Sequence, residues 1–277
     1  MSCRGTNRIA GLALALSLLA TPAVAQEHFD VLLYEDSSGD VGTALVDVDT
    51  AGVTPGQVIE GELLGDTLSV SPTFTGEGPG FFSFSDTAVA GGPPGFPAGA
   101  DNLTGSSQVS LDFLVEPTLG LSLAFWNDGL GQWEAPGVGD SIMMSTLLDP
   151  GGSIDGTSEI IDMVLATTSG SGSMDDHPDY ELSNGSPTGV YLAYGQASVA
   201  GYADPSMPFW IVFGTLDECE ETDSCNAAQE LFNEGIEDQI DAAIGYTEAN
   251  LVPEPGTGLL LAFGLGGMAL RRRGKQE

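Results

Sequence analysis

The chain has 277 residues, of which 40 are acidic and only six are Lys or Arg, giving a formal net charge of −34. All six basic residues lie within the first eight or the last seven positions, and 38 of the 40 acidic residues, all except Glu254 and Glu277, lie in residues 26–251. The long central part therefore has no permanent cation to contact a phosphate, which excludes nucleic acid and anionic membrane surfaces as its partners.

The N-terminus has the pattern of a secretory signal peptide. Arg4 and Arg8 precede the apolar stretch Ile9–Leu19, and the small-x-small sequence Ala23-Val24-Ala25 follows it. This order predicts a signal peptide over residues 1–25, cut after Ala25. The alternative, a first buried helix, would need a polar face that the apolar stretch lacks. We therefore expect the chain to be exported.

From Gln26 onward, short β-branched and aromatic runs alternate with clusters of Gly, Pro, Ser and Thr, a pattern typical of strands joined by turns. The predicted strands are Phe29–Tyr34, Val41–Val48, Val58–Leu64, Gly80–Phe84, Gln108–Val115, Leu121–Trp126, Ser141–Leu147, Gly189–Val199 and Phe209–Gly214. Such spacing favours an all-β fold, an antiparallel β-sandwich or jelly-roll that forms a single domain over residues 26–218.

The chain contains two histidines, and each is followed two positions later by an aspartate, in His28-Phe29-Asp30 and His177-Pro178-Asp179. Residues i and i+2 of a strand share a face, so each pair could present an imidazole and a carboxylate together. Two such pairs on neighbouring strands would offer four nitrogen and oxygen ligands suited to zinc. The alternative is coincidence in a chain so rich in Asp.

Calcium is the other cation to consider. Further acids, Asp175, Asp176 and Glu181, lie close to His177, and acid and glycine clusters occur at residues 36–40 and 47–52. Neither cluster has the full spacing of an EF-hand loop, so both are interpreted as solvated turns. Self-repulsion among the carboxylates could be offset by bound divalent cations or, alternatively, screened by salt.

The sequence offers little for catalysis. No Gly-x-Ser-x-Gly elbow lies beside a histidine, and a phosphate-binding Lys motif cannot occur where there is no Lys. A non-catalytic protein is therefore predicted. A carbohydrate-binding module is an alternative, since Trp126, Trp133 and Tyr202 could stack on sugars, although such side chains are more commonly core residues.

Residues 219–251 are predicted to form a disulfide loop followed by a helix. Cys219 and Cys225 would close a small loop in an oxidising compartment. Beyond them, Asn226–Asn250 carries apolar residues at helical spacing, which predicts an amphipathic helix capped by Asp223 or Ser224.

The last segment, residues 252–277, has three parts: the sequence Val252-Pro253-Glu254-Pro255, a nearly uncharged run over residues 256–270, and the cluster Arg271-Arg272-Arg273. Fifteen helical residues reach about 22 Å, less than the ~30 Å of a bilayer core. The basic cluster favours the cytoplasmic side. We predict a transient anchor in the cytoplasmic membrane, and this segment as the chain's only membrane contact.

This tail resembles the PEP-CTERM family of bacterial sorting signals, which combine a Pro-Glu-Pro motif, an apolar segment and an Arg-rich end. The resemblance implies an exosortase-type membrane peptidase as a partner and delivery to the cell surface or the extracellular medium. It also implies an extracellular polysaccharide or matrix as a further partner to consider.

The body is similar to a group of exported β-rich proteins with the same tail and paired His-x-Asp elements, through residues 28–34, 177–194 and 204–213. This resemblance implies metal handling as a role to consider, and no enzyme activity. The second element of the group often holds more than one histidine, whereas here His177 stands alone. The leading prediction is a non-catalytic surface or matrix protein, with metal-binding (zinc or calcium) and carbohydrate-binding proteins as the alternatives.

Overall fold

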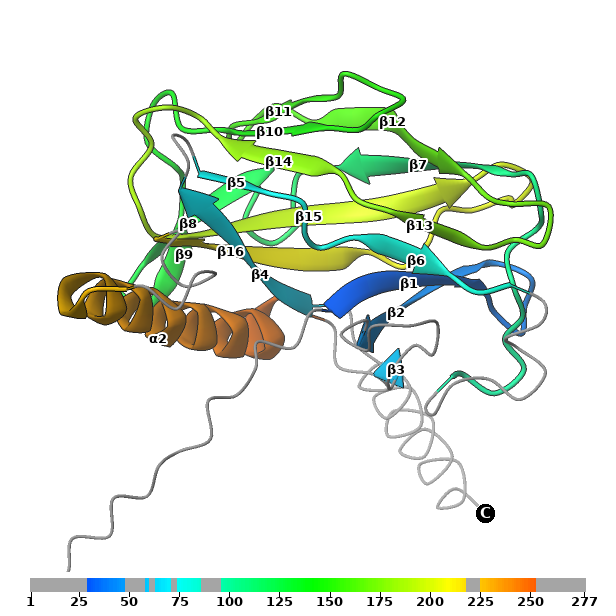
Figure 1. The fold of residues 1–277 in the computed structure, drawn as a ribbon, viewed down its shortest axis with the longest axis horizontal. Helices are drawn as coiled ribbons and strands as arrows, with labels where there is room; N and C mark the ends of the chain where they lie inside the picture. Colours follow the sequence, from blue (N-terminus) through cyan, green and yellow to red (C-terminus); the bar gives the residue numbers. More distant parts are fainter. Residues whose placement is uncertain are drawn as a thin grey trace, which may run out of the picture.

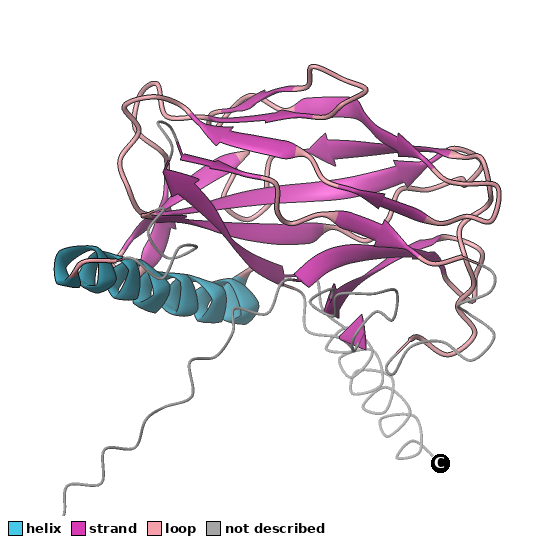
Figure 2. Ribbon diagram, in the orientation of Figure 1, coloured by secondary structure: helices cyan, strands magenta, loops and turns pink. Residues whose placement is uncertain are grey.

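The computed structural model describes residues 29–47, 58–59, 63–70, 74–85, 96–217 and 225–252. The predicted signal peptide, His28, Cys219, and the sorting residues Pro253, Glu254, Pro255, Arg271, Arg272 and Arg273 lie outside these ranges. The described part contains sixteen strands and one helix, α2 (Ala227–Asn250), and Figure 2 shows this strand-dominated body. The predicted all-β fold with one C-terminal helix is confirmed.

Five strands form the smaller sheet. Their order is β13 (Met174–Asp176), β6 (Phe81–Ser83), β1 (Phe29–Glu35), β2 (Val41–Asp47) and β3 (Val58–Ile59). All neighbours are antiparallel except β1 and β6, which run parallel. This sheet brings the start of the described body beside residues that follow far along the chain.

The larger sheet contains the remaining eleven described strands (Figure 1). Its main path is β11 (Gly152–Ile154), β10 (Ile142–Ser145), β14 (Asp179–Leu182), β5 (Phe74–Gly76), β4 (Leu63–Val70), β16 (Phe209–Leu216), β15 (Val190–Val199), β7 (Gln108–Phe113) and β12 (Ile160–Thr167). Off this path, β8 (Leu123–Asn127) pairs with β15 and with β9 (Gln132–Glu134). Only β4 and β16 pair in parallel within it.

The two ends of that path meet, so the larger sheet curls round its core. In the loop between β10 and β11, the Thr146 hydroxyl donates to the Val164 carbonyl at 2.7 Å. The N–H of the same residue, Val164, donates a second hydrogen bond to Asp149 Oδ2 in this loop at 3.2 Å. These bonds tie the β10–β11 hairpin to β12 and give partners to the N–H and carbonyl of Val164, which would be exposed at an open sheet edge.

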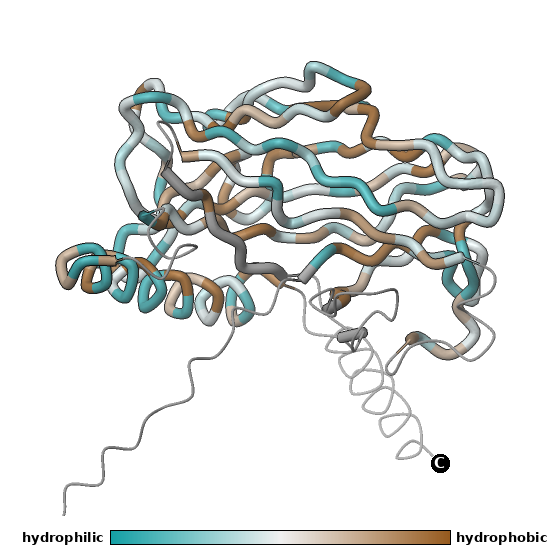
Figure 3. The backbone as a smooth tube through the Cα atoms, viewed as in Figure 1, coloured by the Kyte–Doolittle hydropathy of each residue, from teal (hydrophilic) through white to brown (hydrophobic). Residues whose placement is uncertain are grey.

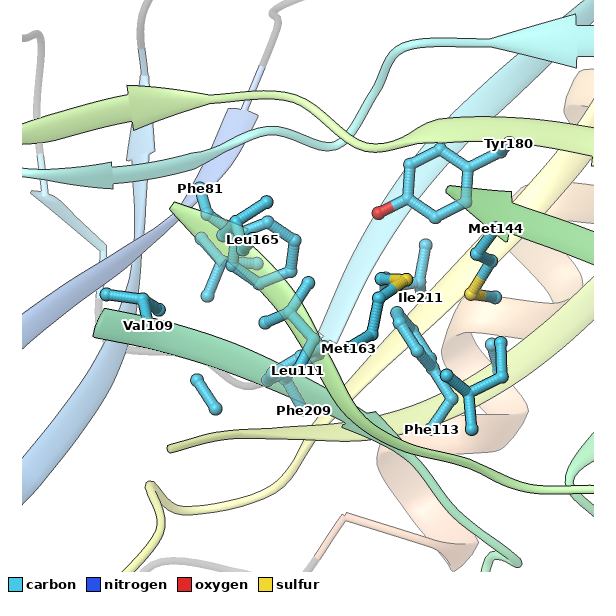
Figure 4. Close-up of a cluster of buried hydrophobic side chains, with 14 of the residues drawn as sticks. Phe81, Val109, Leu111, Phe113, Met144, Met163, Leu165, Tyr180, Phe209 and Ile211 are labelled. Carbon is cyan, nitrogen blue, oxygen red and sulfur yellow. The ribbon is translucent and has the colours of Figure 1, made fainter. Parts of the chain in front are cut away.

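The main core contains apolar side chains from both sheets, and Figure 4 shows part of it. Phe81 of the smaller sheet packs against Phe209 of the larger one in a T-shaped arrangement with 5.6 Å between ring centroids, whereas Tyr180 and Phe213, 5.0 Å apart, pack within the larger sheet. Each fully buried ring contributes about 1.5–3 kcal/mol. The Phe81–Phe209 contact joins the two sheets.

Strand β16 is buried along its whole length, as its continuous apolar sequence predicts. Phe209 and Phe213 face the main core, whereas Trp210 and Val212 face a second cluster under α2. The helix can approach because position 214 is glycine: a Cβ there would lie 2.3 Å from Ile240 Cδ1. α2 therefore covers the second face of the sheet, as Figure 1 shows.

Helix α2 begins at Ala227, one residue after the predicted start at Asn226, and its N-cap lies two or three residues after the predicted caps. Asn226 is the N-cap, and it forms a capping box with Gln229, in place of the predicted Asp223 or Ser224. Figure 3 shows hydrophilic and hydrophobic residues alternating round the helix, in keeping with its predicted amphipathic pattern. Among the described helices, none is both long and apolar enough to cross a membrane.

All nine predicted strands are present, although Val58–Leu64 divides into β3 and β4. The prediction missed β5, β9, β11, β12, β13 and β14. Most of these have only three or four residues, and several are acidic or bounded by glycine, so their apolar alternation is too short to recognise.

Several side-chain predictions can be placed in this fold. Trp126 and Trp133 are 3% and 5% exposed in the cluster under α2, so neither is available to stack on a sugar. The side chain of Asp36 accepts hydrogen bonds from the Ser38 and Asp40 N–H groups, which makes residues 36–40 a turn. Cys225 is disulfide-bonded, and its pairing with Cys219 stays a prediction.

Candidate cation site and sorting segment

The smaller sheet brings Asp30 and His177 together across three strands. Val31 on β1 pairs with Phe81 on β6, and Phe81 pairs with Asp176 on β13. One residue along, the same register aligns Asp30, Gly80 and His177 in a row. Residues 147 positions apart in the chain thus share one face of the sheet.

Asp30, Asp175 and His177 each direct one ligand-type atom to a common point, and these atoms lie within 4.8 Å of one another. His177 Nε2 is 3.4 Å from Asp175 Oδ1 and 3.9 Å from Asp30 Oδ2. A protonated imidazole would form an ion pair here, and a neutral one would offer its Nε2 lone pair to a cation.

Asp30 is the buried member of the cluster, with only 1% of its side chain exposed. Its Oδ1 accepts a hydrogen bond from the Gly80 N–H at 2.8 Å, which fixes the carboxylate in the sheet. Burial of a carboxylate is costly unless a charge or several donors compensate it. Asp30 is therefore a strong acceptor for a positive partner.

His177 is oriented by the loop before β6. Its Nδ1 lies 2.9 Å from the carbonyl oxygen of Glu77, and because a carbonyl only accepts, Nδ1 is the protonated nitrogen. Nε2 then points toward the two carboxylates. His177 is also the only side chain among the described residues that can be positively charged.

The imidazole lies against the backbone of Gly80. A Cβ at that position would come within 2.4 Å of His177 Cε1 and 2.7 Å of Nε2. Only glycine leaves room for the ring to lie across β6 between Asp175 and Asp30. The cluster therefore requires glycine at position 80, because a side chain there would overlap the imidazole of His177.

Asp176 lies beside the cluster but belongs to a different environment. Burial raises its pKa, repulsion from Asp175 raises it further, and His177 opposes both. Asp176 pairs with Phe81 rather than with the row that contains Gly80. It therefore contributes to the local negative potential without joining the three converging groups.

The structure brings together two of the four predicted metal ligands, Asp30 and His177, and His28 lies outside the described residues. Asp179 begins β14 in the larger sheet, because the chain leaves the smaller sheet at His177-Pro178. Asp175 takes its place two residues before His177. Residues two positions apart in a strand share a face, and this relation holds for Asp175, two residues before His177, rather than for Asp179, two residues after it.

The sorting segment starts where the folded body ends. Leu251 is 6% exposed in the cluster under α2, and the N–H groups of Leu251 and Val252 donate to the Thr247 carbonyl at 2.8 and 3.1 Å. Trp133 Nε1 in turn donates to the Thr247 hydroxyl at 2.9 Å. The chain is thus held to the body up to the first residue of the predicted motif.

The fold and its final segment define an all-β body followed directly by a separate C-terminal signal. Residues 251–273 match the family model of the PEP-CTERM protein-sorting motif. The tail of the chain therefore carries a PEP-CTERM sorting motif, which supports export and recognition by an exosortase. This confirms the resemblance that the tail predicted.

The body is less well matched. No curated protein matches the chain. Among solved structures, the CupB6 tip adhesin from Pseudomonas aeruginosa is similar with 15% identity and a TM-score of 0.24. The match covers 56% of this chain and 39% of the adhesin.

Proposed function

We propose that this protein is a non-catalytic component of the bacterial cell surface or extracellular matrix, held transiently in the cytoplasmic membrane until an exosortase releases it. The observation that carries this proposal is the sorting motif at residues 251–273, which follows the folded body without a linker. A stable β-rich body delivered in this way suits a structural or binding role outside the cell.

The surroundings of the described histidine also favour a role without catalysis. His177 lies beside Asp30, Asp175 and the Glu77 carbonyl. These groups bind a proton or a cation, whereas acyl transfer needs a serine or cysteine nucleophile next to the imidazole.

The proposal is tested by fractionating bacteria that express the full chain with and without an exosortase. With the peptidase, we expect the protein on the surface or in the medium. Without it, or after Pro253→Ala with Glu254→Ala, we expect retention in the membrane fraction.

Glu248→Ala provides the matched control, because it removes an exposed acid near the end of α2 and leaves the motif intact. This variant should be sorted normally. Equal release of all variants, with or without the peptidase, would contradict the proposal.

A further inference from the structure

The three converging groups have the composition of a metal site. One imidazole nitrogen and two carboxylate oxygens from β1 and the end of β13 lie within 4.8 Å of one another. We propose that Asp30, Asp175 and His177 bind a divalent transition-metal ion of the zinc class. This inference goes beyond the proposed surface role and does not depend on it.

The histidine is already set for metal ligation. Metal-binding histidines generally donate their second ring N–H to a carbonyl or carboxylate, which fixes the tautomer and the ring plane. Here the Nδ1–H to Glu77 carbonyl bond of 2.9 Å does this, and it places the lone pair on Nε2, the nitrogen that faces the two carboxylates. Gly80 fixes the position of the ring through close contact.

Asp30 is anchored in a similar way. Its Oδ1 accepts the Gly80 N–H, and its Oδ2 faces His177. An ordered carboxylate loses little freedom when it binds an ion. One glycine thus positions two of the three ligands, by its N–H on one side and by its missing side chain on the other.

The charges also balance. A divalent ion with two carboxylates and a neutral imidazole gives a neutral site, whereas the imidazolium alone leaves one negative charge in excess. No Lys or Arg occurs in the described part of the chain to supply that charge. A divalent cation from solution would match the charge of the two carboxylates.

The donor set selects the class of ion. Calcium and magnesium prefer six or more oxygen ligands, whereas zinc and its neighbours accept imidazole and function with three protein ligands plus water. Asp175 is 65% exposed and His177 34% exposed, which leaves the outer side open to an entering ion and to coordinating water.

The test uses the full chain, kept in solution with detergent, labelled with 15N and titrated with Zn²⁺ in excess Ca²⁺. The excess Ca²⁺ is added so that it occupies the carboxylates that bind any cation without selectivity, which leaves Zn²⁺ to report on selective sites. NMR measures the 15N chemical shifts of the ring nitrogens of the two histidines, and the variant His177→Gln assigns the signals to each histidine. We expect one equivalent of Zn²⁺ to shift His177 Nε2.

Asp175→Asn should weaken Zn²⁺ binding by at least about tenfold, comparable to the loss of a metal-site residue. Asp179→Asn is the matched control, because it removes the same charge four residues away and lies outside the cluster. Both aspartates are exposed, so neither change should disturb folding.

The proposal is overturned if Zn²⁺ leaves His177 Nε2 unshifted, if Ca²⁺ prevents the shift, or if the two Asn variants bind Zn²⁺ equally. Surface delivery is scored in the same variants. Its loss alone would count against the proposed function and leave the metal site standing.

Discussion

Gly80 shows how one residue sets the geometry of the cluster. Its N–H donates a hydrogen bond to Asp30, and because it has no side chain, the ring of His177 can lie against its Cα. Neither role is visible in the sequence, where Gly80 is predicted only as the first residue of the strand Gly80–Phe84. Side-chain packing between distant strands created the requirement.

Gly80→Ala should lower the free energy of unfolding by about 1–3 kcal/mol, because the added methyl group overlaps the imidazole. Gly170→Ala is the control, since its Cβ would meet nothing within 4 Å. Urea unfolding of both variants measures the difference. Equal stabilities would show that the ring moves aside without cost.

Asp155 carries a pH prediction. Hydrogen bonds from the Ser158 and Thr157 N–H groups, at 2.8 and 3.1 Å, lower its pKa from 3.8 to about 2. A pKa lowered by folding adds stability above pH 3.8, and this contribution is lost as the pH falls through about 2. A carboxyl NMR titration, assigned with Asp155→Asn, checks it, and a midpoint near 3.8 would contradict it.

At the residue scale, alternation in a strand was enough to select Asp30 and His177 as partners. It selected Asp179 as the second acid beside His177, although Asp175 also lies two positions from that histidine. Pro178 decides the matter: proline cannot donate to a ladder, and here the chain crosses to the other sheet.

The elements that the sequence predicted most clearly were those with long apolar patterns. The continuous run of β16 and the helical spacing of α2 predicted these elements because burial on both faces, or on one stripe, leaves a clear pattern. Strand β13 was missed because its three residues, Met174-Asp175-Asp176, carry no such pattern and depend on pairing with β6.

Two neighbouring tryptophans under α2 differ in their hydrogen bonding, which allows the contribution of one hydrogen bond to the helix packing to be predicted. Trp133 Nε1 donates to the Thr247 hydroxyl at 2.9 Å, whereas Trp126 Nε1 is buried without a hydrogen-bond partner. Trp133→Phe and Trp126→Phe remove similar volumes, so Trp133→Phe should cost about 1 kcal/mol more in thermal or urea unfolding. Equal losses would mean that this hydrogen bond does not stabilise the helix.

The whole molecule is dominated by uncompensated carboxylates, since 38 acidic residues share the body between the two ends with no Lys or Arg. Added NaCl should therefore raise the free energy of unfolding, because screening over about 10 Å at 0.1 M weakens the self-repulsion of the compact state. Urea unfolding at low and high ionic strength measures this effect. Stability that falls with salt would indicate net favourable electrostatics.

We propose that the tail is a sorting signal that is removed outside the cytoplasm. Intact-mass measurement on protein collected from the surface or medium of exosortase-bearing cells tests it most directly. We expect a chain that begins at Gln26 and has lost the Arg271-Arg272-Arg273 cluster, and so contains no Lys or Arg. An exported chain that still ends at Glu277 would contradict the account.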